Sequence, residues 1–506
     1  MNSRRIRTKL ALGAVLGLAA AGTALAATGT GPSTTTDPYV IPVADGVDVS
    51  SLLTVETPTD TGAASNGYQM VGIPDGLGAT LGSGDDNFTL FMNHELQAAS
   101  GVAREHGATG AFVSKWSINA ETLEVEQGAD LIQTGVRFWD YAAHEYTTDA
   151  AAAGQEPRFA RFCSGFLSLP GQLFNDRTGN GYDGQIYFAN EENGDGGRDF
   201  GVTTEGRAQQ LPRLGLFSWE NSLVGLNRGD VTYIQGQEDT GPTSGQLHVY
   251  VGEKQDTGNA FDRAGLTKGE QFVVDLHNEK VSTDAGFRAT YGKNHPAPFD
   301  LGSDERVDWD QTGADQNADA AAKGLGLNRI EDGAFDPRHP EDFYFVTTEG
   351  GSGATTARDG GGLWRLSYYN PERPWKGGTL TLLLDGSEAP FLNKPDNVGF
   401  DRSGHLLIQE DPGNNAHVAR IVAYDVKSGR RAVLATFDPA LFEPGAPGFV
   451  TQDEESSGII DASRFLGPRT FLFDAQVHKA HPDADKVEMG QLLALHVDDW
   501  SEVFPK

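Results

Sequence analysis

The sequence is poor in residues on which several large protein classes depend. It contains one cysteine, Cys163, among 506 residues, so it cannot build a disulfide framework. Its 39 Lys and Arg residues are outnumbered by 71 Asp and Glu residues, which gives a formal net charge of −32. Such an acidic surface repels nucleic acids and anionic membranes, and we expect neither as a partner. We expect a monomer stabilised by its core, by bound cations, or by both.

Motifs of several enzyme classes are also missing. No GxSxG nucleophile elbow, GxxxxGK[ST] phosphate loop or HExxH zinc motif occurs, because His94-Glu95 has no second histidine in register. The 12 histidines are scattered and form no zinc-ligand cluster. Any hydrolytic chemistry must therefore use carboxylates, the lone thiol and arginines.

The only long apolar run is at the N-terminus. Residues 1–26 have a basic start, an Ala-rich stretch and the small-residue site Ala24-Leu25-Ala26, which together predict a signal peptide. Ser3-Arg4-Arg5 resembles a twin-arginine signal, so we expect a secreted protein exported by that route, with Sec export as the alternative. Residues 27–40 are expected to form a flexible tether. No later segment reaches about 18 uninterrupted apolar residues, the length of a membrane span.

What the sequence does contain is a repeated pattern of short strands and tight turns. An apolar strand ending in an acidic or amide residue, often after an Asp/Gly/Pro turn, recurs six times. This pattern predicts an all-β fold, a six-bladed β-propeller over residues 41–506, although a stretched or split blade would make five or seven. The region 255–325 is expected to be a loop and helix insertion beside the channel mouth. If the six strands are equivalent, their acidic ends converge near the channel: Glu95, Glu191, Glu253, Glu349, Glu410 and Asp474.

Carboxylates gathered around a channel must either protonate or bind cations. Amide neighbours could supply further oxygen ligands for Ca²⁺: Asn93, Asn190, Asn193 and Asn397. Two loops, 176–183 and 308–319, place oxygens at alternate positions in the manner of Ca²⁺ sites. Each is also consistent with a plain Asp/Gly turn, which is the more common meaning of such a loop.

Cys163 also allows two interpretations. A single buried cysteine is most often a small hydrophobic residue. Next to a group of cations, however, its thiolate would bind a transition metal that carboxylates alone hold less well.

Taken in chain order, these residues resemble the PhoX alkaline phosphatases and the wider group of PhoX-like secreted propeller proteins. The resemblance extends over nearly the whole mature chain, and the order of the motifs is more specific than any one of them. The matching segments are Asn93-His94-Glu95, Cys163-Ser164-Gly165, Glu191-Glu192, Arg329-Ile330-Glu331, Asp396-Asn397, Glu455-Ser456-Ser457-Gly458 and Gln476-Val477-His478.

The resemblance implies a phosphomonoesterase with Fe³⁺ and Ca²⁺ at the channel mouth. Cys163 would be the iron ligand, and Arg329 would hold the phosphate of a small phosphoester substrate. Glu331 would be both a metal ligand and catalytic. The remaining iron or calcium ligands would be Glu95, Glu191, Glu192 and Glu455.

The sequence departs from the resembled family at two positions. Asp332 stands where PhoX has a tryptophan, and could add a ligand, displace calcium or cap a turn. Ser164 stands where PhoX often has alanine or glycine, and this change is expected to be minor. Two alternatives to the phosphatase remain: another Ca²⁺-dependent propeller hydrolase (a phosphodiesterase, phytase-like enzyme or lactonase), or a non-enzymatic extracellular propeller that Ca²⁺ stabilises.

Overall fold

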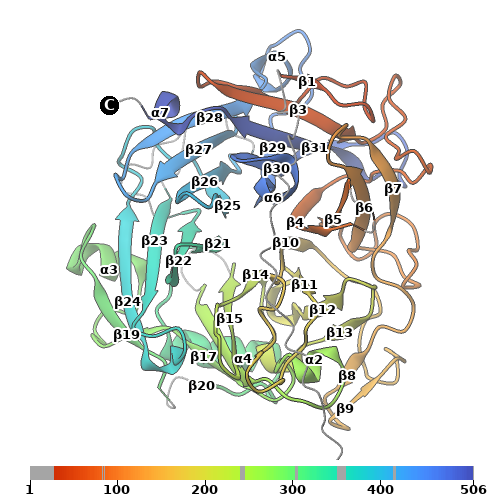
Figure 1. The fold of residues 1–506 in the computed structure, drawn as a ribbon. Coiled ribbons are helices and arrows are strands. Elements are labelled where there is room, and N and C mark those ends of the chain that lie inside the picture. The colour runs from red at the N-terminus through yellow and green to blue at the C-terminus, as the bar shows by residue number, and fades with distance from the viewer. Residues whose placement is uncertain are drawn as a thin grey trace, which may run out of the picture.

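The computed structural model describes residues 28–82, 84, 86–239, 245–302, 306–349, 361–413 and 418–504. Over these residues, six large sheets surround a common axis, which confirms the six-bladed β-propeller (Figure 1). The predicted signal peptide lies outside the described residues. Among the helices of the described chain, none is long and apolar enough to cross a membrane.

Each blade begins with its innermost strand and proceeds outward. Blades 1 and 2 are β4 (Pro74–Leu81), β5 (Asn87–His94), β6 (Phe112–Asn119), β7 (Val125–Asp130), and β10 (Phe162–Leu167), β11 (Ile186–Glu191), β12 (Asp199–Thr203), β13 (Ala208–Gln210). Blade 3 is β14 (Trp219–Val224), β15 (Val231–Glu238), β16 (Leu247–Glu253), β17 (Glu270–Val273) and β20 (Arg306–Val307). Between blades 1 and 2 the chain forms a small hairpin, β8 (Phe138–Asp140) and β9 (Glu145–Thr147).

Blade 4 has six strands, and blades 5 and 6 have five each. Blade 4 is β21 (Ile330–Asp336), β22 (His339–Thr347), β23 (Gly362–Tyr368), β24 (Gly378–Leu384), β19 (Ala297–Asp300) and β18 (Asp275–Leu276). Blade 5 is β25 (Pro395–Phe400), β26 (His405–Glu410), β27 (Arg420–Asp425), β28 (Arg431–Phe437) and β2 (Val40–Pro42). Blade 6 is β29 (Glu454–Asp461), β30 (Thr470–Ala480), β31 (Glu488–Val497), β3 (Val47–Thr54) and β1 (Gly29–Thr30).

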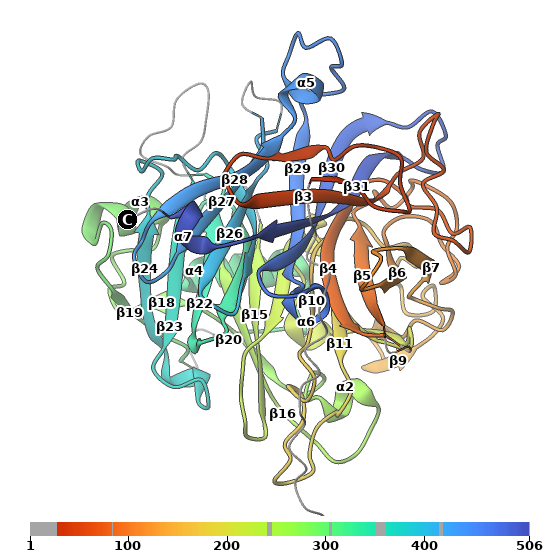
Figure 2. The same ribbon diagram turned by 45° about the horizontal axis from the view of Figure 1, so that its top comes forward.

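The N-terminal segment closes the ring of blades. β3 pairs with β31, so that strands from both ends of the chain build blade 6 (Figure 2). The segment 27–40, expected to be a flexible tether, is instead packed onto the propeller from residue 28 onward. β1 pairs with β3, and buried Thr34 donates a hydrogen bond to Asp60 over 2.5 Å.

The region 255–325 contains the expected helices, namely α2 (Ala260–Arg263), α3 (Asp284–Thr290) and α4 (Gly313–Lys323). It also contributes strands to the outer edges of blades 3 and 4, so it is not separate from the propeller. α4 lies beside the short helix η1 (Gly194–Gly196), where Asn317 donates a hydrogen bond to Asp195 over 2.7 Å.

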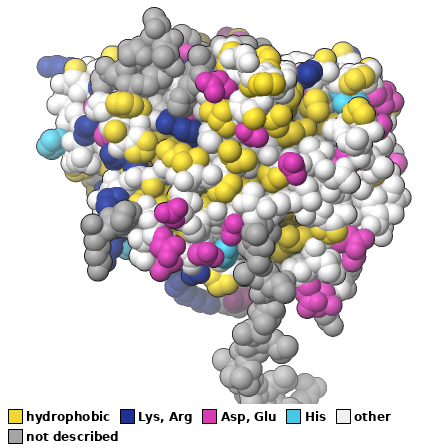
Figure 3. Space-filling model, turned by 90° about the horizontal axis from the view of Figure 1, so that it is seen from above, with side chains coloured by type: hydrophobic (Ala, Val, Ile, Leu, Met, Phe, Trp, Pro, Cys, Tyr) yellow, Lys and Arg dark blue, Asp and Glu magenta, His cyan; other side chains and the backbone are white. Residues whose placement is uncertain are grey.

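The core lies between the blades, because each blade is covered on both faces by its neighbours. The second strands are therefore nearly continuous apolar runs, such as HLLIQE in β26, whose last five residues are buried. Trp116, Trp219 and Trp364 are among the largest side chains that are fully enclosed in this way. On the side that lies uppermost in Figure 1, hydrophobic side chains are interspersed with acidic and uncharged polar ones (Figure 3).

A β-bulge near the start of the innermost strand recurs in blades 1 to 5. In blade 1, for example, the register shifts between Pro74 and Leu77, so that Asp75 and Gly76 lie opposite one residue of β5. The other four are in β10, β14, β21 and β25. A bulge re-aims the side chains that it carries, and here it sits at the channel.

Candidate metal centre

The second residue of each innermost strand forms a ring around the channel, which we call the first ring. Its members are Asp75, Cys163, Glu220, Glu331, Asp396 and Glu455. All six are buried. Each blade thus contributes one metal-ligating side chain at an equivalent position, five carboxylates and one thiol.

A second ring lies toward the channel mouth, the end at which the innermost strands begin. In blades 1 to 5 it is formed by the residue that follows the second strand: Glu95, Glu192, Asp239, Thr348 and Asp411. In blade 6 the equivalent residue is His478, which lies within β30. In every blade its backbone N–H donates to the carbonyl two positions before the first-ring residue, as Glu95 does to Ile73 over 2.9 Å. The same hydrogen bond in six blades makes the two rings a repeated feature of the fold.

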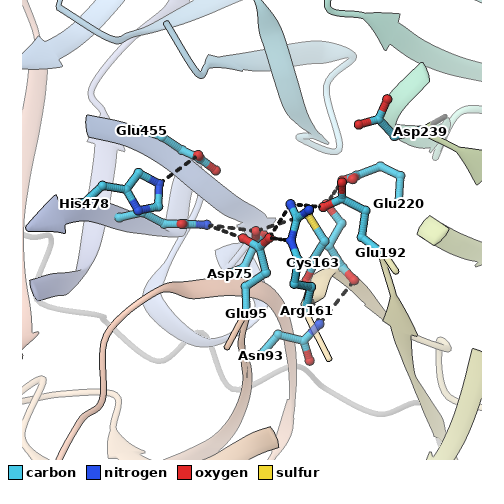
Figure 4. A network of polar contacts seen from close by, with 12 residues as sticks. Asp75, Asn93, Glu95, Arg161, Cys163, Glu192, Glu220, Asp239, Glu455 and His478 are labelled. Carbon is cyan, nitrogen blue, oxygen red and sulfur yellow. Dashed lines mark hydrogen bonds and ion pairs between the residues drawn. The ribbon is translucent and has the colours of Figure 1, made fainter. Parts of the chain in front are cut away.

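Side chains of the two rings form three overlapping groups that could each hold a metal ion. In each group the ligand atoms all lie within 4.8 Å of one another. The groups are Asp75, Glu95 and Cys163; Cys163, Glu192 and Glu220; and Glu220, Glu331 and Asp396. Because Cys163 belongs to two groups and Glu220 to two, the groups form a continuous row, part of which is visible in Figure 4.

The carboxylates of the two rings lie close enough to repel one another. Burial, and then repulsion from neighbouring acids, raises the pKa of the first-ring carboxyl groups of Asp75, Glu220, Glu331 and Asp396 well above the usual range. The same causes raise the pKa of Glu455 to about 7. A cation placed among these groups would remove the repulsion, so the site favours positively charged ligands.

Cationic side chains lie above the rings at the mouth. Arg161 forms ion pairs with Glu95 and Glu192 of the second ring, the first over 2.7 Å. Arg329 forms ion pairs with Asp239 over 2.9 Å and Glu331 over 3.1 Å.

Both arginines have left-handed backbones, φ 48° for Arg161 and 52° for Arg329. This conformation is costly for a residue with a Cβ, and such strain clusters at functional sites. Their side chains remain about one third exposed, 36% and 31%, so each arginine can reach a ligand that enters the mouth.

Cys163 lies in the middle of the row of acids, between Asp75 and Glu95 on one side and Glu192 and Glu220 on the other (Figure 4). Its Sγ is 3.5 Å from Asp75 Oδ2, to which the thiol donates. The environment is polar and acidic rather than apolar. Cys163 therefore differs from a cysteine that only fills the hydrophobic core.

The structure brings together most of the residues predicted from the sequence. Glu95, Cys163, Glu192 and Glu331 lie in the three groups, and Glu455 completes the first ring beside His478. Glu191, in contrast, belongs to none of these groups. Both its carboxylate oxygens bind the guanidinium of Arg198, over 2.6 and 2.7 Å, so its negative charge is already neutralised.

The expected convergence of six strand ends at the channel is wrong for most of the residues named. Glu253 is exposed at the end of β16, and Glu410 binds Arg420 in the same way as Glu191 binds Arg198. Asp474 lies within β30, and Glu349 lies one residue beyond the second ring. The ring is built by the innermost strands instead, because these line the axis of a propeller.

Several members of the rings were missed, namely Asp75, Glu220, Asp239 and Asp411. Four innermost strands open with the same short pattern, in which a proline or aromatic residue precedes an acid or cysteine and then small or amide residues. It appears as PDG at 74–76, FCSG at 162–165, WENS at 219–222 and PDN at 395–397. A search for repeats that started from the recognised PDN segment could have found the others.

The remaining candidates serve structural roles. In the loop 176–183, Thr178 and Asn175 bind Asp230, while Asp176 and Asp183 point to solvent. In the loop 308–319, Thr312 caps α4. Of the residues that the structure describes, none in either loop belongs to a group able to hold a metal, which favours the plain-turn interpretation.

Asp332 is likewise not aimed at a metal position. Its Oδ1 accepts hydrogen bonds from Asn221 and Gly333, and its Oδ2 accepts one from the backbone N–H of Val398 over 3.2 Å. Asn93 binds the carbonyl oxygens of Cys163 and Ser164 through its amide nitrogen, so it braces a bulge.

The donor set fits a mixed metal centre. Hard carboxylate oxygens suit Ca²⁺, and the one thiolate suits a transition metal. Asp75 Oδ1 is buried and has no hydrogen-bond partner, so it is available as a ligand. Oxygens and sulfur from several blades converge at distances short enough for shared ligands.

Comparison with known proteins shows the fold. No family model matches the sequence, and no curated protein matches it. Among solved structures, Pseudomonas fluorescens PhoX in complex with vanadate, a transition state analogue, superposes with a TM-score of 0.60 at 13% identity, covering 91% of this chain and 98% of that one. A gluconolactonase from Xanthomonas campestris gives a TM-score of 0.35 at 11% identity, covering 92% of this chain and 99% of that one.

Proposed function

We propose that the protein is a metal-dependent phosphatase that hydrolyses phosphate monoesters at the channel mouth, with calcium and iron as its metals. One observation carries the proposal: six blades each place a metal-ligating side chain at one level of the channel, and one of the six is a thiol. The superposition on a propeller that binds vanadate supports the choice of phosphoryl chemistry.

The arrangement of charge suits a phosphate ester. The acids of the two rings would hold the cations, which when bound would supply Lewis-acid polarisation of the phosphoryl group and activation of water. The chain's own arginines, Arg161 and Arg329, lie on the solvent side of the acids, where their guanidinium forks can bind phosphate oxygens. The acidic protein can then bind an anionic substrate, because the arginines and the metal ions would separate the substrate from the carboxylates.

The first test combines metal analysis with an assay. We expect protein purified after native export to contain iron and calcium and to hydrolyse an aryl phosphate such as p-nitrophenyl phosphate. Glu331→Gln should lower kcat by at least about 100-fold, in the range seen when a group stabilising the transition state is removed. Glu253→Gln is the matched control, because this exposed glutamate ends a strand outside both rings. Full activity in Glu331→Gln would contradict its assignment.

The two alternatives give different results in the same experiment. Calcium without iron, together with turnover of a phosphodiester or a lactone but not of a monoester, would indicate another propeller hydrolase. Bound calcium with no hydrolysis of any of these substrates would indicate a binding protein. Inhibition by vanadate with the monoester as substrate would support the phosphatase.

A further inference from the structure

We propose that Ser164 is a positioning residue of the metal centre: its hydroxyl holds Glu220 in place and links it to Asn397 across the channel. This inference rests on the two rings acting as a metal site. It does not require that the bound metals hydrolyse a phosphoester.

Ser164 follows Cys163 in β10 and is 2% exposed. Its hydroxyl donates to Glu220 Oε1 over 2.7 Å and accepts from Asn397 Nδ2 over 2.5 Å. A hydrogen bond to a buried carboxylate is among the stronger kinds. The hydroxyl therefore both donates and accepts a hydrogen bond within this site.

The hydroxyl bridges opposite sides of the propeller. Ser164 belongs to blade 2 and Asn397 to blade 5, and in a ring of six these blades face each other. Their side chains meet directly, so the hydrogen bond spans the channel next to the first ring.

Glu220 is the carboxylate for which position matters most. It belongs both to the group with Cys163 and Glu192 and to the group with Glu331 and Asp396. The hydrogen bond engages Oε1 and so restrains the orientation of the carboxylate. A carboxylate shared between two metal positions must keep one orientation to serve both, and Ser164 supplies this constraint.

Asp332 extends the same layer beneath the ring. It accepts from Asn221, the neighbour of Glu220, and from the backbone of Val398 in blade 5. Within the short segments that resemble the PhoX family, Ser164 and Asp332 are the two residues noted as departing from the family's pattern. Both departures thus place hydrogen-bonding groups under the acids of the ring.

The test is a metal titration of the full chain. Metal-free protein is titrated with Ca²⁺ and, separately, with Co²⁺, using calorimetry for affinity and stoichiometry and the thiolate-to-Co²⁺ absorption for the position at Cys163. We expect Ser164→Ala to weaken the Ca²⁺ positions that use Glu220 by about 10- to 100-fold, the usual effect of removing a group that orients a ligand. The thiolate-to-Co²⁺ absorption should remain. It depends on the group of Asp75, Glu95 and Cys163, and in the described residues the side-chain hydrogen bonds of these three residues do not involve Ser164.

Ser168→Ala is the control. Ser168 is also buried just beyond the end of β10, but its hydroxyl accepts from the backbone N–H of Ile186 and lies away from the rings. It should lower stability without changing metal affinity. Asn397→Ala provides a second variant, which should give a smaller loss because Ser164 still donates to Glu220.

Each outcome decides the inference. Equal affinity and stoichiometry in wild type and Ser164→Ala would overturn it, as would a wild-type protein that binds neither ion. If the variants lose metal as expected while no monoester is hydrolysed, the inference stands and the proposed phosphatase fails. If Ser164→Ala does not fold, unchanged binding in Asn397→Ala would overturn it.

Discussion

At the scale of single residues, the lone cysteine is explained by its position rather than by a partner. Cys163 occupies one of six equivalent places, and the other five are carboxylates. A single soft ligand among hard ones can distinguish a transition metal from calcium. One thiol is sufficient for this purpose.

The first prediction replaces this thiol by the acid found elsewhere in the ring. Asp75 and Asp396 show that aspartate is accommodated at equivalent positions. In Cys163→Asp we expect calcium to be retained and iron to be lost, because an all-oxygen site no longer favours the softer ion. Elemental analysis of the purified variant beside wild type measures both metals. Unchanged iron content would show that the thiol is not a ligand.

Asp199 illustrates a buried acid outside the rings. It is 1% exposed, and burial raises its pKa to about 8, an effect that a hydrogen bond with the Ser222 side chain offsets only in part. Between about pH 4 and pH 8 the unfolded chain ionises this group while the folded protein keeps the proton. Stability therefore falls as pH rises through this window, by up to about 1.4 kcal/mol per pH unit.

The second prediction follows from that sign. Asp199→Asn should be more stable than wild type at pH 8, and the advantage should shrink as the pH falls toward 4. Urea unfolding at pH 5, 6.5 and 8 measures the difference in the free energy of unfolding between the two proteins. The acids of the rings are the same in both, so their contribution to the pH dependence cancels in this difference. A constant difference at all three pH values would mean that Asp199 ionises normally in the folded protein.

At the scale of elements, the bulge near the start of the innermost strand in blades 1 to 5 decides where the first-ring side chain points. Gly76 shows how closely these bulges pack, because a Cβ on it would lie 2.1 Å from the backbone nitrogen of Gly165 and 2.5 Å from the carbonyl carbon of Ser164. Both contacts are with backbone that cannot move without displacing β10. The first and second blades thus approach each other next to Cys163.

The third prediction uses this contact. Gly76→Ala should push the bulge of β10 away, lower stability by at least about 1–3 kcal/mol as overpacking does, and reduce the metal content. Gly84→Ala is a suitable control, since in the part of the chain that the structure describes no atom beyond its chain neighbours lies within 4 Å of a Cβ at that position. Thermal unfolding and elemental analysis of the two variants provide the comparison. Equal metal content in both variants would show that the packing of this bulge does not affect metal binding.

The elements also show how far the sequence could predict the site. Short strands and Asp/Gly turns identified a six-bladed propeller, since these signals are local. The ring was partly misassigned because Glu191 and Glu410 end their strands in the expected way but bind Arg198 and Arg420. Which acids are neutralised depends on pairing across strands, and the sequence does not display a bulge that turns Asp75 or Glu220 inward.

At the scale of the whole molecule, the metal centre connects segments that are distant in the chain. Asp75 lies in blade 1 and Glu455 in blade 6, and the intervening blades supply the other first-ring residues. No covalent bond closes the ring of blades. Blade 6 is completed by hydrogen bonds and packing between β3 and β31. Ions that bind several blades at once would therefore act as cross-links at the axis.

The fourth prediction concerns removal of these ions. An ion that binds only the folded protein stabilises it by about 4 kcal/mol when its free concentration is 1,000 times its Kd. Treatment of loaded protein with a strong chelator should therefore lower the Tm and the urea midpoint together, and should do so less in Glu220→Gln, which already lacks a shared ligand. Readdition of calcium should restore much of the loss. A Tm that does not respond to the chelator would mean that packing between blades alone holds the acids together, and the rings would then lose their role as a cation site.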